Sequence, residues 1–595
     1  MRLVHIWQLQ SAPFFSVLIG DARGYDEWAR RLAAGDWVGS EVFYQAPLYP
    51  YFLGLIYRAL GSDALTVRVV QAIVGSLSCA AIAFAGYRLF SRRAGMVAGV
   101  ALAFYPAAIF FDALVQKSVL DLFFTCVALA LIAVVLASRE RRRAAWFGLG
   151  VVVGALSLTR ENALLLAVVV FLWALQQSFE ISRNRPANNV RDRLSPALFV
   201  AGLALVLLPV ACRNAAVGGG FYLTTSQFGS NFFIGNNPAS DGTYMSLRPG
   251  RGDPEFERTD ATELAEQASG RALMPAEVSD YWFTRALTFI RGEPAMWLRL
   301  MTRKAALLVN TSEMLDTESQ ESHAEYSSIL ALTSLVGRFG VLVPLALFGA
   351  FVVWPRRREL WVLYALTLTY AFSVVLFFVM ARYRHPLLPF FLLFAAAGVT
   401  GGSTFLRSVW RRQLAAVAAV VFAAVVITNR PMLSSTLMRA ISEHNLGAAL
   451  QEQGRVDEAI VHYERALTLQ PDYAPSYNNL GIVRMAKGEL AGAVSAFRES
   501  LRLRPSPQAA ELLAQADYDM GSALAERGAF ARAELLFREA LQLQPDYAEA
   551  HNNLGITLAS MGKLEEAIGH WREALRIRPG FADAERNLAV ALSHK

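Results

Sequence analysis

Residues 118–137 read SVLDLFFTCVALALIAVVLA, a run that is apolar almost throughout. A helix needs roughly 20 apolar residues to cross the hydrocarbon core of a bilayer, so this stretch predicts a transmembrane helix. Hydropathy predicts further spans near residues 65–88, 94–111, 144–159, 162–177, 195–213, 328–353, 360–380, 386–402 and 413–428. Of the 595 residues, 54% are hydrophobic and 18% are charged, which indicates a polytopic membrane protein with a further domain attached.

Polar residues interrupt the series of spans at two places. A single helix through residues 159–162 would bury Arg160 and Glu161 in the middle of the membrane, so we predict a hairpin of two spans there. Residues 1–20 contain several polar side chains and make a poor span, and we expect a first transmembrane helix that lies partly upstream of Met1. The start of the chain has no typical signal peptide, so insertion is expected to rely on the spans themselves.

Basic residues gather on one side of the predicted spans. Arginine-rich stretches at 91–93, 139–143, 183–193, 356–358 and 407–412 all fall on the same side when the spans alternate. By the positive-inside rule that side is the cytoplasm, and the net charge of +7 reflects membrane anchors, so nucleic-acid binding is not expected. The extracytoplasmic side then collects Asp21, Asp112, Lys117, Arg160, residues 214–325, residues 382–385 and everything after 429.

The C-terminal part repeats itself. Glycines at 447, 481, 521 and 555 recur at intervals of 34, 40 and 34, and the prolines at 471, 505, 545 and 579 recur with the same spacing. This pattern resembles the tetratricopeptide repeat, a pair of helices that stacks into a superhelix. Four repeats cover about 440–581, residues 582–594 form a capping helix, and the six extra residues within 505–517 are expected to lengthen one helix or loop. We predict a membrane domain at 1–428, a linker at 429–441 and a repeat domain at 442–595.

Some asparagines of the repeats resemble those that contact extended peptides in this family, and they predict a groove for a protein partner: Asn478, Asn479, Asn552 and Asn553. The alternative is that they only cap or solvate helices.

The first outer loop carries a second resemblance. Asp21 is followed by Tyr25 and Ala29, and then by Pro47-Leu48-Tyr49, as in the first loop of the glycosyltransferase C superfamily, in particular the protein O-mannosyltransferases and the lipid A aminoarabinose transferases. The resemblance implies a polyprenyl-phosphate sugar as donor and a first-loop aspartate as catalytic base. Many members have an Asp-Glu pair, which here is Asp26-Glu27, so either Asp21 or Asp26 could be equivalent; the spacing to Tyr25 favours Asp21. More weakly, the resemblance extends over about residues 15–400.

Such a transfer needs a base for the acceptor hydroxyl and cations for the phosphate leaving group. Asp21 is the predicted base. The cations predicted to bind the donor phosphate lie at outer membrane boundaries: Lys117, Arg160, Arg382 and Arg384. Structural alternatives exist, because Lys117 and Arg384 could extend to lipid headgroups and Arg160 could pair with Glu161.

Further residues are predicted to contact the sugar or the acceptor: Tyr25, Tyr49, Asp112, Asn231, Asn236 and Asn237. The three asparagines lie in the long outer segment 214–325, which we expect to cover the active site. An alternative is that Asn236-Asn237-Pro238 only forms a turn. A lone His385 before a proline favours a structural role.

The predicted fold is therefore all-α: a polytopic membrane helix bundle with an extracytoplasmic loop domain and a C-terminal tetratricopeptide solenoid. The predicted function is a glycosyltransferase of the cell membrane that takes a lipid-linked sugar as co-substrate and a protein as acceptor, held by the repeats. A lipid or envelope glycan acceptor and a non-catalytic membrane scaffold remain alternatives. No His/Cys/Asp cluster has ligand spacing, so no metal ligand is predicted and metal use is left open.

Overall fold

The computed structural model describes residues 1–137, 142–184, 194–218, 220–248, 251, 254–314 and 317–593. These residues form helices and connecting turns, with no strand among them, as predicted for an all-α chain. The chain divides into two compact units, Met1–Ser435 and Thr436–Lys595. The boundary falls within the predicted linker 429–441, most of which is helical, because α21 ends at Asn429 and α22 begins at Ser435.

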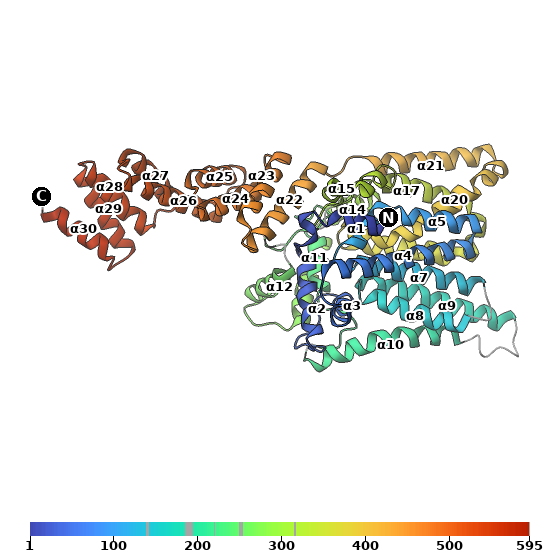
Figure 1. Cartoon of the computed structure of the whole chain (residues 1–595). Coiled ribbons are helices and arrows are strands. Elements are labelled where there is room, and N and C mark those ends of the chain that lie inside the picture. Colours follow the sequence, from blue (N-terminus) through green and yellow to red (C-terminus); the bar gives the residue numbers. More distant parts are fainter. Residues whose placement is uncertain are drawn as a thin grey trace. The chain divides into compact units, whose positions relative to one another are not determined.

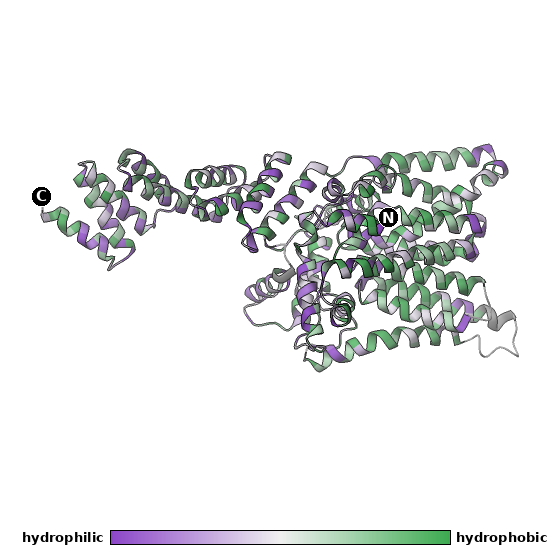
Figure 2. Cartoon of the chain, viewed as in Figure 1, coloured by the Kyte–Doolittle hydropathy of each residue, from purple (hydrophilic) through white to green (hydrophobic). Residues whose placement is uncertain are grey.

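The first unit is a bundle of apolar helices lying side by side (Figure 1). Figure 2 shows hydrophobic residues along these helices and hydrophilic residues gathered at their ends. Within the described residues, seven helical segments are long and apolar enough to cross a membrane. They are Ala64–Leu89 (α4), Ser118–Ala137 (α7), Glu161–Phe179 (η2 and α9), Ser195–Ala216 (α10), Trp354–Leu376 (η4 and α18), Ala381–Ser408 (α19, η5 and α20) and Arg411–Asn429 (α21). The protein is therefore a multi-pass membrane protein.

The predicted spans at 94–111 and 328–353 are not single helices. In the first, α5 (Arg92–Ala103) and α6 (Pro106–Ala113) meet at an angle of 52°. Pro106 cannot continue the hydrogen-bonding of α5 and holds the residue before it in an extended conformation, so the helix breaks there. In the second, α16 spans Ser328–Thr333 and α17 spans only Phe339–Val352.

A helical hairpin is present at the predicted position 159–162, but its first helix has 16 residues, so the predicted span at 144–159 is not among the seven. Helix α8 (Arg142–Ser157) ends before a short turn and the 3₁₀ helix η2 (Glu161–Ala163), and α9 (Leu164–Asn184) then packs against α8. Helix α8 also packs closely on α10, where Gly150 and Gly202 face the opposite backbone. A Cβ at Gly150 would lie 2.0 Å from a carbonyl oxygen of α10, so glycine is required for this approach.

The two ends of the bundle differ. The α4–α5 turn meets η4 (Trp354–Arg356), which precedes α18 (Arg357–Leu376), at one end, where Arg356 donates to the carbonyl oxygen of Leu89 at 2.7 Å. The opposite end carries short helices (Figure 1). They include α2 (Asp21–Ala33), α3 (Leu48–Leu60), α11 (Phe228–Gly235), α12 (Pro254–Ser269), α13 (Pro275–Gly292), α14 (Pro294–Val309) and α15 (Gln320–Tyr326). The segment 214–325, which is predicted to lie outside, thus consists largely of helices and is not an open loop.

The second unit consists of stacked helix pairs: α22 (Ser435–Glu452) with α23 (Val456–Leu469), α24 (Ala474–Ala486) with α25 (Leu490–Leu503), α26 (Pro507–Glu526) with α27 (Phe530–Leu543), and α28 (Ala548–Ser560) with α29 (Leu564–Ile577), followed by α30 (Ala582–Ser593). The extra residues lengthen α26, which has 20 residues where α24 and α28 have 13. The repeated glycines lie where the paired helices cross: a Cβ at Gly555 would be 2.6 Å from the ring of Trp571.

Candidate active site

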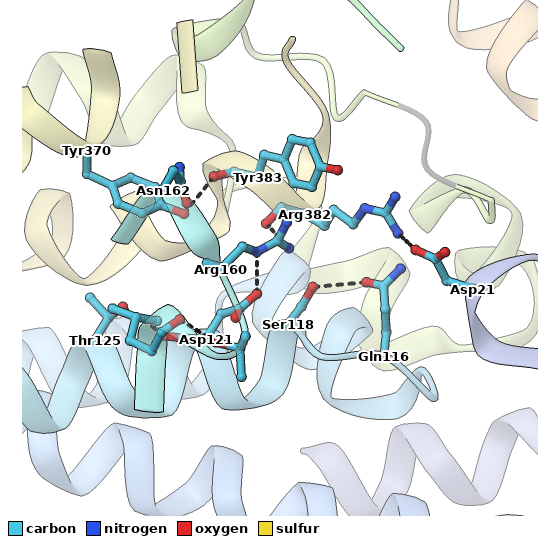
Figure 3. Close-up of polar contacts among 12 residues, drawn as sticks. Asp21, Gln116, Ser118, Asp121, Thr125, Arg160, Asn162, Tyr370, Arg382 and Tyr383 are labelled. Carbon is cyan, nitrogen blue, oxygen red and sulfur yellow. Dashed lines mark hydrogen bonds and ion pairs between the residues drawn. The ribbon is translucent and has the colours of Figure 1, made fainter. Parts of the chain in front are cut away.

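Asp21 is the first residue of α2 and lies at the end of the bundle where the short helices gather. It follows Gly20, whose φ of 56° is accessible mainly to glycine, and a carboxylate is favourable at a helix N-terminus. The side chain is buried, and its two oxygens accept from different partners. Arg382 forms an ion pair with one oxygen, and Gln45 donates to the other at 3.2 Å. Figure 3 shows Arg382 extending toward Asp21.

The environment of Asp21 keeps it ionised at neutral pH. Burial disfavours the carboxylate, but the charges of Arg382 and Lys117 outweigh this effect, and the pKa of Asp21 lies below its ordinary value. A general base must be unprotonated before it can take a proton, so Asp21 has the charge state that the predicted role needs.

Arg160 lies beneath this pair, in the turn before α9. Its Nε donates to Asp121 Oδ2 at 2.6 Å, and its Nη2 donates to the carbonyl oxygen of Arg382 at 2.9 Å (Figure 3). The Tyr370 hydroxyl donates to the next carbonyl, that of Tyr383, at 3.2 Å. Arg160 therefore ties α7 to the backbone of α19 (Ala381–Arg384).

Asp121 is not among the residues predicted from the sequence. It is fully buried on α7, and the structural alternative for Arg160, a pair with Glu161, is replaced by the pair with Asp121. A single acid within an otherwise apolar span was the available signal, because a charge at membrane depth needs a partner.

Lys117 sits at the junction of α6 and α7, buried beside the same network. Burial lowers its pKa, and it interacts electrostatically with Glu161, Arg160 and Arg382. Glu161 in turn accepts from Gln227 at 2.9 Å and from Thr225 at 3.1 Å, which attaches the long outer segment to the site. The structure thus brings together Asp21, Lys117, Arg160 and Arg382.

A second carboxylate, Glu257 on α12, lies near these groups. Burial raises its pKa to about 7, and the negative charge of Asp21 adds to the effect, while Arg382 and Lys117 oppose it. Tyr244 is its close neighbour. The site therefore contains one carboxylate with a lowered pKa and one with a raised pKa, which is typical of acid–base chemistry. The sequence does not single out Glu257, because a glutamate on an amphipathic helix between membrane spans is expected to be solvated.

Other predicted site residues have structural partners elsewhere. Asp112 is buried in an ion pair with Arg2 at 2.5 Å. Tyr49 is fully buried, donates to Gln71 at 2.5 Å and packs edge-on against Tyr25. Tyr25 is also buried, although its electrostatic neighbours include Asp21 and Arg382.

Arg384 and Asp26 likewise lie apart from the Asp21 pair. Arg384 is fully buried and donates to the carbonyl oxygens of Asn310 at 2.6 Å and Ser312 at 2.9 Å, so it braces the chain after α14. Asp26 lies five residues further along α2, where it pairs with Arg30 at 2.8 Å and accepts from Tyr57 at 2.6 Å. Of the two candidate bases, only Asp21 is within the cationic network.

Asn236 and Asn237, directly after α11, bond to backbone groups. Asn236 is buried and donates to the carbonyl oxygens of Phe232 at 2.9 Å and Leu376 at 2.7 Å. Asn237 donates to the carbonyl of Phe233 at 2.9 Å and accepts from the amide of Ala239, which is the turn geometry given above as the alternative. Asn231 lies on α11 and is partly buried.

The asparagines of the repeats lie on α24 and α28, the first helices of their pairs. Asn479 donates to the hydroxyl of Tyr463 at 3.3 Å, and Asn553 donates to that of Tyr518 at 3.1 Å. Asn552 donates to Asn553 at 3.1 Å, and Asn478 is partly buried. Within the described residues, no group of three or more His, Cys, Asp or Glu side chains has the arrangement of a metal site.

Fold and site together define a multi-pass membrane protein with a buried cluster of ionisable side chains at one end of the bundle and a helical repeat domain. Residues 44–210 match the family model described as dolichyl-phosphate-mannose-protein mannosyltransferase, and residues 438–506, 521–562 and 548–581 match tetratricopeptide repeat models. The chain thus combines an N-terminal region that matches this glycosyltransferase model with C-terminal tetratricopeptide repeats. The first match includes Lys117, Asp121 and Arg160, but it does not include Asp21 or Arg382.

Several individual proteins are similar to short parts of the chain. It is 32% identical over 109 residues to the photosystem I assembly protein Ycf3 of Cyanophora paradoxa, which covers 18% of this chain and 63% of that protein. It is 44% identical over 62 residues to protein FlbA of Caulobacter vibrioides, covering 10% of each. The chain thus spans less than two thirds of these relatives. The crystal structure of MamA aligns with 25% of this chain and 83% of its own, at 26% identity and a TM-score of 0.21.

Proposed function

We propose that this protein transfers a sugar from a polyprenyl-phosphate donor to an acceptor hydroxyl on the extracytoplasmic side of the cell membrane. The observation that carries the proposal is the ionised Asp21 with Arg382 and Lys117 beside it, at the end of an apolar helix bundle. A lipid phosphate lies at this depth when its chain is in the bilayer, and cations there can neutralise it.

In the proposed reaction, Asp21 takes the proton of the acceptor hydroxyl while the acceptor oxygen bonds to the anomeric carbon. The bond from that carbon to the phosphate oxygen breaks, and polyprenyl phosphate leaves with the electron pair. Arg382 and Lys117 offset the charge that develops on the phosphate. Arg160 contributes as a positioning residue, because it holds the backbone of Arg382.

The tetratricopeptide repeats favour a protein as the acceptor. Tetratricopeptide superhelices bind polypeptides, and the predicted topology puts residues after 429 on the same side as Asp21. A bound polypeptide would then be tethered near the site, which commonly raises its local concentration to about millimolar. We therefore propose a protein acceptor; a glycan or lipid product would instead make the repeats an assembly scaffold.

The test is transfer by the purified full-length protein in lipid vesicles, supplied with labelled polyprenyl-phosphate sugars and envelope extracts, with the labelled product identified by mass spectrometry. Asp21→Asn should lower transfer about a hundredfold or more while the protein still folds. Asp26→Asn, on the same helix, is the matched control and should have a much smaller effect. Near-normal turnover of Asp21→Asn would remove Asp21 from the role of base.

A second arm separates the two domains. Removing residues 442–595 should leave donor binding intact and sharply reduce transfer to the physiological acceptor. If the labelled product is a glycan or lipid, and its yield is independent of the repeats, acceptor delivery by the repeats is wrong.

A further inference from the structure

Both carboxylate oxygens of Asp21, the proposed base, have partners in the structure. One carboxylate oxygen of Asp21 is taken by the guanidinium of Arg382, and the other accepts from Gln45. A carboxylate held in an ion pair is a poor proton acceptor, because the cation stabilises its charged form. Reaction at Asp21 therefore requires that Arg382 first release it.

The two ion pairs of the site differ in accessibility. The side chains of Arg160 and Asp121 are 4% and 0% exposed, whereas those of Arg382 and Asp21 are 12% and 9% exposed. Arg160 also holds the backbone carbonyl of Arg382. The pair of Arg160 and Asp121 is therefore a fixed support. The pair of Arg382 and Asp21 is the one that a ligand can reach, and a ligand can replace Asp21 as the partner of Arg382.

A lipid phosphate is a suitable competitor for the outer arginine. The guanidinium fork binds phosphate oxygens as well as carboxylate oxygens, often through two hydrogen bonds. Lys117 lies close enough to Arg382 and Arg160 for their like charges to repel. An arriving anion relieves this repulsion, which a neutral ligand cannot do.

We propose that Arg382 is a latch on Asp21: it holds the carboxylate until the phosphate of the donor takes the guanidinium, so that donor binding must precede proton transfer. This inference rests on the proposed function, because the order of donor binding and proton transfer has meaning only for a sugar transferase. Its step is an exchange of ion pairs, in which Arg382 moves from Asp21 to the lipid phosphate and no covalent bond changes. Only the side chain moves, because the backbone stays attached to Arg160 and, through Tyr383, to Tyr370.

The latch predicts a measurable change at Asp21 that needs no sugar transfer. Loss of a cation within ion-pair distance raises a carboxyl pKa by about one to three units, a tenfold to thousandfold change in proton affinity. The experiment is an infrared titration of the full-length protein in detergent, with Asp21→Asn used to assign the carboxyl band of Asp21. We expect polyprenyl phosphate to raise the pKa of Asp21 by at least about one unit, and unphosphorylated polyprenol to leave it unchanged.

Variants then test the arginine itself. Arg382→Gln should show the raised pKa of Asp21 without lipid and no further response to polyprenyl phosphate, and Arg382→Lys should keep part of the response. Arg30→Gln is the matched control: it removes an arginine that pairs with Asp26 at 2.8 Å on the same helix and should leave Asp21 unaffected.

The result that overturns the latch is an unchanged or lowered pKa of Asp21 in the wild-type protein with polyprenyl phosphate, including the case in which the lipid does not bind. This arm needs no variant, so poor folding of Arg382→Gln does not weaken it. A raised pKa in a protein that transfers no sugar would uphold the latch and refute the proposed function.

Discussion

The ion pair between Arg160 and Asp121 offers the sharpest test of how the site is supported. Both side chains are buried, and their atoms are 2.6 Å apart. Asp121→Asn leaves the guanidinium of Arg160 without a counter-ion, which typically costs about 3 to 5 kcal/mol in a buried site. Arg160→Gln strands the carboxylate in the same way and also removes the bond to the carbonyl of Arg382. Each single variant should therefore be strongly destabilised.

The double variant shows whether Arg160 and Asp121 act as a pair or independently. With Asn and Gln in place of both charges, neither residue is an unpaired ion, so the cost should be much less than the sum of the two single costs. We expect a coupling free energy of about 2 to 3 kcal/mol from the double-mutant cycle. An exposed pair, Arg271 with Glu277 at 2.7 Å, is the control and should couple only weakly, because solvent screens both charges.

Tryptophan fluorescence during unfolding in mixed detergent micelles can measure these free energies in the bundle. Of the 11 tryptophans, only Trp571 lies beyond Ser435, so the signal reports almost entirely on the first unit. Additive effects of the two substitutions would refute the buried pair.

Three further outcomes follow from the geometry. Burial raises the pKa of Asp517 to about 7 from 3.8, so the repeat unit should lose stability as pH rises between these values; Asp517→Asn should flatten this dependence in thermal unfolding of residues 436–595. Ser560→Cys, in a background without the exposed Cys212, should react with a membrane-impermeant thiol reagent on intact cells or spheroplasts, and labelling only after lysis would put the repeats in the cytoplasm. Gly150→Leu or Gly202→Leu should block the contact of α8 with α10 and reduce the yield of folded protein in detergent chromatography, and normal elution would contradict the close packing.

Many residues of the site can be recognised from the sequence, because ionisable residues beside apolar membrane spans are uncommon. Asp21, Lys117, Arg160 and Arg382 stand next to apolar segments, where an ionisable group needs a reason to be present. Their assembly in one network could not be deduced from spacing, since Asp21 and Arg382 are 361 residues apart in the chain. Asp112 and Arg384 satisfy the same sequence rule and yet serve as structural partners of Arg2 and of the chain after α14, because burial next to a complementary group uses a charge equally well for support.

The sequence by itself determined the class of the molecule. Apolar runs of membrane length require helices in a bilayer, and the recurring glycines and prolines require a stacked repeat, because both signals are periodic and local. Tertiary structure alone decided which cations meet which acids. Asp121 rather than Glu161 pairs with Arg160, Glu257 lies close to Asp21, and Arg382 forms an ion pair with Asp21. These pairings depend on how helices far apart in sequence pack, which no residue pattern along a single helix encodes.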